Sequence, residues 1–125
     1  MVVDASILLA IFFKEAHSQW AANQLNAHAT ELCMSTVNLA EVLIQSQDRQ
    51  PKLFPELKKN LLDGNIRFVP PDVFQAQIAA EARLKYPLNL GDCFVYALAI
   101  SEDSSILTLD RDFRAVDRPV ILPPK

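Results

Sequence analysis

Apolar and polar positions follow two different spacings along this chain. Short apolar runs typical of buried strands alternate with longer segments whose apolar residues recur at helical spacing. The short runs predict strands at residues 1–3, 31–34, 66–69, 105–109 and 120–122. The longer segments predict helices at residues 6–12, 17–26, 36–47, 51–63, 72–85 and 93–100, and a short helix from Asp110 to Val116.

Strands that alternate with helices favour an α/β fold, in which a central parallel sheet is flanked by helices on both faces. The chain has 125 residues and no repeat or low-complexity linker, so we expect a single domain spanning residues 1–125. Right-handed crossovers place the carboxyl ends of parallel strands at one edge of the sheet. Ligands of such sheets bind at that edge, so polar residues that follow strands are the first candidates for function.

Two acids directly follow predicted strands, Asp4 after the first and Asp110 after the fourth. Asp92 precedes the apolar segment 93–100, and Glu41 lies within the predicted helix 36–47. Each has a simple structural explanation. Asp4, Asp92 and Asp110 suit helix caps or first turns, where the backbone amides favour an anion. Asp112 suits the same role as Asp110.

Glu41 shares a helix face with three polar residues, which a solvated polar stripe explains. These residues are Asn38, Gln45 and Asp48. Thr36 is the expected cap of this helix. Taken together, however, the four acids predict one carboxylate cluster at the carboxyl edge of the sheet. Clustered carboxylates repel unless a cation is present, and hard divalent ions such as Mg²⁺ prefer oxygen ligands.

Other chemistries fit the sequence poorly. Both glycines are isolated, so no glycine-rich phosphate loop exists, and the serines lack the context of a nucleophile elbow. Cys33 and Cys93 are far apart among apolar neighbours, which predicts reduced core thiols rather than a metal site. His17 and His28 lie in a polar segment and are expected at the surface. Zinc is therefore not expected.

The bulk charge leaves the binding surface open. The net charge is −3 and the pI is about 5.3, which taken alone argues against a nucleic-acid binder. The basic residues gather in three small groups that we interpret as solvated faces: Lys52, Lys58 and Lys59; Arg83 and Lys85; and Arg111, Arg114 and Arg118. The start of the sequence lacks a basic leader, and residues 5–13 are too few to span a bilayer, which predicts a cytoplasmic protein without a membrane partner.

Four segments resemble the acidic motifs of PIN domains, in the same order and at similar spacing. They are Val-Val-Asp-Ala-Ser at residues 2–6, Ser-Thr-Val-Asn-Leu-Ala-Glu-Val at 35–42, Leu-Asn-Leu-Gly-Asp-Cys-Phe-Val-Tyr-Ala-Leu-Ala at 88–99, and Ile-Leu-Thr-Leu-Asp-Arg-Asp-Phe at 106–113. The resemblance runs from Met1 to about Leu122. The compact length is similar to that of VapC-type toxins of toxin–antitoxin pairs.

The resemblance implies a PIN-like three-layer fold and a Mg²⁺- or Mn²⁺-dependent endoribonuclease. Asp4, Glu41, Asp92 and Asp110 would form the acidic quartet that holds the metal and carries catalysis. Thr108 and Ser6 would support the site, and Asp112 matches a position that is less uniformly acidic. The resemblance also implies an RNA substrate, a homodimer and a small inhibitory antitoxin partner.

Two alternatives remain open at this point. The first is a non-catalytic PIN-like scaffold that binds RNA or protein, although retention of all four acids speaks against it. The second is a phosphoryl-transfer protein of the receiver or phosphatase type with Asp4 as nucleophile. The sequence after Asp4 lacks the second aspartate of the phosphatase motif, and no late strand-end lysine matches a receiver.

Overall fold

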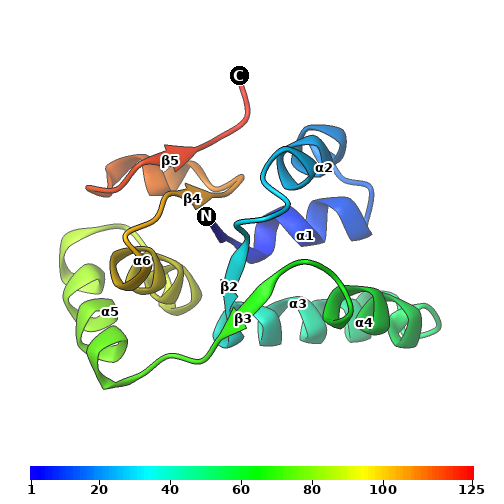
Figure 1. The fold of residues 1–125 in the computed structure, drawn as a ribbon, viewed down its shortest axis with the longest axis horizontal. Helices are drawn as coiled ribbons and strands as arrows, with labels where there is room; N and C mark the ends of the chain where they lie inside the picture. Colours follow the sequence, from blue (N-terminus) through cyan, green and yellow to red (C-terminus); the bar gives the residue numbers. More distant parts are fainter.

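A parallel sheet of five short strands runs through the middle of the molecule (Figure 1). The computed structural model describes residues 1–125. The strands are β1 (Val2–Val3), β2 (Cys33–Ser35), β3 (Arg67–Val69), β4 (Ile106–Leu107) and β5 (Val120–Ile121). Their order is β3-β2-β1-β4-β5, and every neighbouring pair is parallel. The predicted α/β class with a parallel sheet is confirmed.

The central strand β1 marks the point at which the strand order reverses. From β1 the chain moves to β2 and β3 on one side of the sheet, then returns to β4 and β5 on the other. Val2 pairs with Cys33 and with Ile106, and Val3 pairs with Leu107. In open α/β sheets the crevice beyond the strand ends at such a reversal is the usual ligand site. Here the reversal lies between β1 and β4.

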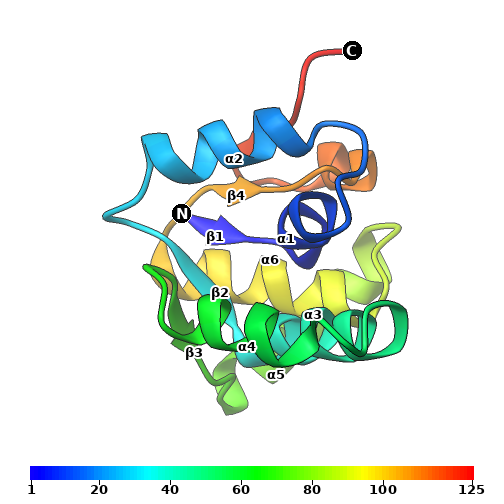
Figure 2. The ribbon, with the colours of Figure 1, turned by 90° about the vertical axis from the view of Figure 1, so that its right-hand side faces the viewer.

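Helices cover both faces of the sheet. In chain order they are α1 (Ala5–Phe12), α2 (Ser18–Ala27), α3 (Thr36–Arg49), α4 (Phe54–Leu62), α5 (Val73–Lys85) and α6 (Leu90–Glu102), followed by the 3₁₀ helix η1 (Arg111–Ala115). Figure 1 shows α5 and α6 on one side of the sheet and α1, α3 and α4 on the other, and Figure 2 shows α6 running behind β1. The predicted three layers are confirmed.

The alternation of side chains along β1 divides the core in two, because successive strand residues point to opposite faces. Val2 packs with Ile106, the apolar face of α6 and Phe113 of η1. Val3 packs with Leu107 and with residues of α1 to α4. Both cysteines are buried and free, as predicted, and no helix has the length and apolar composition needed to cross a membrane.

Several helix ends differ from the predictions for local reasons. Ser35, rather than Thr36, caps α3: its Oγ accepts a 3.2 Å hydrogen bond from the amide of Val37. Helix α4 starts only at Phe54, with Pro55 in its first turn, where the missing N–H of proline is tolerated. Helix α6 starts three residues earlier than predicted, because the side chain of Asn89 caps it.

Candidate active site

Asp4 lies at the carboxyl end of β1 and is almost completely buried. Two hydroxyl groups bind its carboxylate: Ser6 Oγ and Thr108 Oγ1 each lie 2.7 Å from Asp4 Oδ2. Ser6 comes from the first turn of α1 and Thr108 from the residue after β4. A carboxylate at the end of β1 is therefore held by one hydroxyl from α1 and one from the end of β4.

The direction of these two hydrogen bonds follows from the backbone. Ser6 Oγ accepts from the amide of Leu109 at 3.0 Å, and Thr108 Oγ1 accepts from the amide of Asp110 at 2.9 Å. An ionised carboxylate can only accept, so each hydroxyl donates its proton to Asp4 while its oxygen accepts from the amide. Both hydrogen bonds reach Oδ2, which leaves Asp4 Oδ1 without a hydrogen bond from a side chain.

The simple explanation of Asp4 as a helix cap does not hold. Asp4 occupies the position before α1, but its side chain makes no capping hydrogen bond. Burial raises the pKa of the Asp4 carboxyl, the hydrogen bonds from Ser6 and Thr108 oppose this rise, and the charge of Asp110 adds to it. A buried carboxylate that caps nothing is costly unless a cation or a proton compensates it.

Asp92 is both a helix-start residue and a member of the cluster. In the first turn of α6 its Oδ2 accepts from the amide of Asn89 at 3.3 Å, while Asn89 Oδ1 accepts from the amide of Asp92 at 2.9 Å. This is a capping box. Burial raises the pKa of Asp92 to about 7, with further contributions from the charges of Asp4, Asp110 and Glu41. The electrostatics therefore couple Asp92 to the other three acids.

Glu41 reaches the site from the second turn of α3. Asn38 Nδ2 donates to Glu41 Oε1 at 2.7 Å. Burial raises the pKa of Glu41, the hydrogen bond from Asn38 opposes this, and the charge of Asp4 adds to the rise. The solvated stripe expected for this face is wrong at Asn38, which is completely buried, whereas Gln45 and Asp48 are exposed. Helical spacing in the sequence places these residues on one face of α3. It does not show that α6 covers the part of this face at Asn38.

Asp110 and Asp112 differ in burial and in their effect on the other acids. Asp110 is half-buried and caps η1, accepting from the amide of Asp112 at 2.9 Å. The charge of Asp110 raises the pKa of both Asp4 and Asp92. Asp112 is exposed and contributes to neither. Asp110 therefore belongs to the cluster, and Asp112 lies at its margin.

The donor set fits a hard divalent cation. The four acids lie toward one edge of the sheet, and three of them have a pKa raised by burial together with the charge of another. No three His, Cys, Asp or Glu side chains converge closely enough to enclose an ion by themselves. The fit therefore rests on the donor type: carboxylate oxygens are the ligands that Mg²⁺ and Mn²⁺ prefer, and Mg²⁺ keeps several waters and combines one or two carboxylates with phosphate oxygens. This donor set does not suit a closed structural zinc site.

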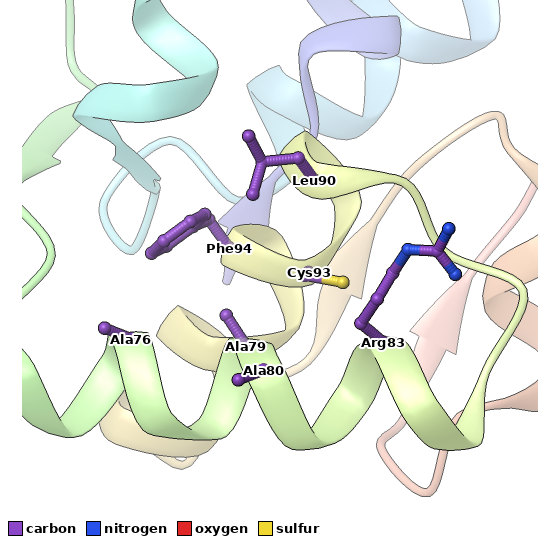
Figure 3. Close-up of a pocket in the computed structure, with 7 residues that line it drawn as sticks. All are labelled: Ala76, Ala79, Ala80, Arg83, Leu90, Cys93 and Phe94. Carbon is purple, nitrogen blue, oxygen red and sulfur yellow. The ribbon is translucent and has the colours of Figure 1, made fainter.

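The largest cavity lies apart from the acids, between α5 and α6 (Figure 3). Its volume is about 260 Å³, and its walls are apolar except for one arginine. The lining residues are Ala76, Ala79, Ala80, Arg83, Leu90, Cys93 and Phe94. None of the four acids lines it, so this cavity is separate from the candidate active site.

Two of the three basic residues near the C-terminus have structural roles. Arg111 donates to the carbonyl oxygen of Pro123 at 3.0 Å. Arg118 pairs with Asp103 at 3.2 Å and donates to the carbonyl oxygen of Ser104 at 2.9 Å. The expected solvated face is wrong for Arg111 and Arg118, because these side chains hold the C-terminal segment to the body of the protein. Arg114 is exposed.

Comparison with known proteins agrees with this architecture. The PIN domain profile matches residues 1–119. Ribonuclease VapC42 of Mycobacterium tuberculosis is 32% identical over an alignment of 127 positions. The alignment covers 94% of this chain and 95% of the relative. Ribonuclease VapC28 of the same organism is 29% identical over an alignment of 133 positions, which covers 94% of this chain and 99% of the relative.

Solved structures show the same fold at lower sequence identity. The crystal structure of VapC20 from Mycobacterium tuberculosis, described as a sarcin-ricin loop cleaving toxin, superposes with a TM-score of 0.83 at 16% identity and covers 98% of both chains. A chain of a toxin–antitoxin complex from Klebsiella pneumoniae superposes with a TM-score of 0.80 at 20% identity, covering 99% and 98%. By profile, relatives and fold, this chain belongs to the PIN-domain family and, within it, to the VapC ribonucleases.

Proposed function

We propose that the protein is an endoribonuclease that hydrolyses RNA phosphodiesters with the help of Mg²⁺ or Mn²⁺. The observation that carries the proposal is the Asp4 carboxylate, buried between the ends of β1 and β4 and fixed by two hydroxyls, among three further acids. Such a site concentrates negative charge where a cation would bridge the protein and a phosphate. Asp4, Asp92 and Asp110 would hold the ion or its waters, and Glu41 would bind a second ion or orient the attacking water.

The protein's own residues do most of the positioning. Ser6 and Thr108 hold Asp4 in one orientation, and the backbone amides of Leu109 and Asp110 hold those hydroxyls in turn. Asn38 fixes Glu41 within α3 and also donates to the carbonyl oxygen of Gly91 on α6. When bound, a divalent ion supplies a water of lowered pKa and neutralises charge on the phosphate in the transition state. In the proposed hydrolysis the water oxygen would form a bond to phosphorus while the bond from phosphorus to the leaving ribose oxygen breaks. The water would give its proton to a nearby carboxylate or to solvent, and the leaving oxygen would take a proton from solvent.

The substrate and biological role rest on the relatives. VapC42 and VapC28 are named ribonucleases, and VapC20 is described as a toxin that cleaves the sarcin-ricin loop. We propose RNA as the substrate and a toxin as the role.

We also propose a small antitoxin as partner and a homodimer as the functional unit. Several structural neighbours are chains of toxin–antitoxin complexes. An acidic site without its cation would attract a basic side chain of an inhibitor. Light scattering of the purified protein tests the dimer. Co-purification with the product of an adjacent small reading frame, followed by loss of RNA cleavage in the complex, tests the antitoxin.

Incubation with RNA in the presence of Mn²⁺, Mg²⁺ or a chelator tests the activity itself. We expect internal cleavage with either ion, none with the chelator, and a loss on the order of 10³-fold in Asp4→Asn. Asp48 is an exposed aspartate on α3, so Asp48→Asn is the matched control and should cleave RNA like the wild type. Cleavage that survives chelation, or that is unchanged in Asp4→Asn, contradicts the proposal. An inert protein that binds no divalent ion by calorimetry points to the scaffold instead.

A further inference from the structure

Gly91 stands in the first turn of α6, where most other residues would serve the helix better. Glycine is among the least favourable residues in a helix. The backbone at Gly91 does not require it, because neither glycine has a positive φ. The reason lies in what a side chain would meet: a Cβ placed on Gly91 would lie 2.6 Å from Glu41 Oε1 and 2.7 Å from Glu41 Cδ. The carboxylate of Glu41 fills the space that a methyl group would occupy.

Asn38 holds the same carboxylate in the same place. Its Nδ2 donates to Glu41 Oε1 at 2.7 Å and to the carbonyl oxygen of Gly91 at 3.0 Å. Both partners are acceptors, so the amide orientation is fixed. Asn38 Oδ1 is left buried without a partner. A buried acceptor without a partner destabilises the fold, so the position of this amide comes at a cost in stability.

We propose that Gly91 and Asn38 are positioning residues that hold the Glu41 carboxylate against the first turn of α6. Gly91 leaves the space, and Asn38 supplies the hydrogen bond and ties α3 to the residue that precedes Asp92. Neither residue touches substrate. The inference rests on the proposed nuclease function for its catalytic consequence, and the geometry of the three residues stands without it.

The nearest atoms to a Cβ at Gly91 all belong to the end of the Glu41 side chain. Gly91→Ala therefore leaves the fold intact and moves the carboxylate. We expect RNA cleavage by Gly91→Ala to fall on the order of 10²-fold, mostly in kcat, because a displacement of about 1 Å has effects of that size. The melting temperature should hold or rise. Gly64→Ala, at the end of α4 and remote from the acids, is the control and should keep full activity.

A double-mutant cycle separates positioning from general damage. Aspartate is one methylene shorter than glutamate, so Glu41→Asp withdraws the carboxylate from the new Cβ. In that background Gly91→Ala should cost less than about twofold relative to Glu41→Asp alone, a threshold set by the usual scatter of additive pairs. Asn38→Leu, which keeps the size and removes the donor, should lower kcat with KM unchanged, and its effect should not add to that of Gly91→Ala.

Thermal unfolding gives a readout that does not depend on activity. Glu41→Ala empties the space, so Gly91→Ala in that background should raise the melting temperature more than it does in the wild type. If the wild type cleaves RNA and Gly91→Ala cleaves equally well, the inference is wrong. Equal losses of activity in the wild-type and Glu41→Asp backgrounds, or equal melting shifts in the wild-type and Glu41→Ala backgrounds, also overturn it. If the wild type cleaves no RNA, the proposed function is wrong. The melting temperatures of Gly91→Ala in the wild-type and Glu41→Ala backgrounds then still test the geometry.

Discussion

The hydroxyl of Thr108 donates a 2.7 Å hydrogen bond to the carboxylate of Asp4, which lies 104 residues earlier in the chain. The two residues follow β4 and β1, which are neighbours in the sheet. Because the same hydroxyl accepts from the amide of Asp110, one completely buried side chain positions two acids of the cluster.

Removing that hydroxyl should therefore damage both stability and activity. Thr108→Val keeps the shape but leaves the amide of Asp110 without its acceptor, at a cost of about 1–3 kcal/mol in the free energy of unfolding. The pKa of Asp4 should rise further, because a hydrogen bond that lowers it is lost. We expect RNA cleavage to fall about tenfold or more, and Thr108→Ser to restore most of it. Denaturant unfolding and initial cleavage rates check this, and an active Thr108→Val enzyme would contradict it.

The two aspartates at the start of η1 should differ in importance. Asp110→Asn removes a charge that acts on Asp4 and Asp92, so we expect a loss of cleavage on the order of 10²-fold. Asp112→Asn alters an exposed side chain and should change the rate less than about threefold. Calorimetry should likewise show a larger loss of Mn²⁺ affinity in Asp110→Asn than in Asp112→Asn. Equal losses from the two substitutions would place Asp112 in the cluster as well.

Stability of the metal-free protein should fall as the pH rises. The pKa of Asp92 is about 7 in the folded protein, against an ordinary value of 3.8, so the folded state binds the proton more tightly than the unfolded state. The resulting stabilisation is fully present below about pH 4 and is lost as the pH rises through about 7. Asp4 and Glu41, whose pKa values are also raised, act in the same direction.

Melting curves in a chelator between pH 5 and pH 8 test this prediction. We expect the melting temperature to decline across that range, and the free energy of unfolding to fall by an amount on the order of 2–3 kcal/mol from Asp92. Asp92→Asn should flatten the decline, whereas Asp48→Asn should not. Mn²⁺ should raise the melting temperature most at the alkaline end, because ligand carboxylates must be deprotonated. A melting temperature that rises with pH in the chelator would refute the assignment of Asp92.

A hydrogen bond remote from the acids should matter for stability alone. Tyr96 on α6 donates to Asp117 Oδ1 at 2.6 Å, which ties α6 to the segment before β5 and lowers the pKa of Asp117. Tyr96→Phe should reduce the free energy of unfolding by about 1–2 kcal/mol. Its cleavage rate at 25 °C should match that of the wild type. A large loss of activity in the folded variant would show that this contact also supports the acidic edge.

The sequence by itself predicted the elements and the edge of the sheet at which the acids lie. Asp4 and Asp110 follow apolar strands, and strands separated by helices are parallel, so these two acids had to share an edge. Asp92, at a helix start, followed the same logic. The polar residues Ser6 and Thr108 came from resemblance to PIN domains, and the structure gives their physical role as hydrogen-bond donors to Asp4.

Only the tertiary structure decided how Glu41 joins the cluster. Helical spacing put Asn38 and Glu41 on one face of α3, and nothing local distinguished a solvated face from a buried one. The packing of α3 against α6 buries Asn38 and places the Glu41 carboxylate in the space that Gly91 leaves free. The raised pKa values of the acids depend on the same packing, because burial and the charges of residues distant in sequence produce them. Burial depends on which helices meet across the sheet, and that is a property of the whole fold.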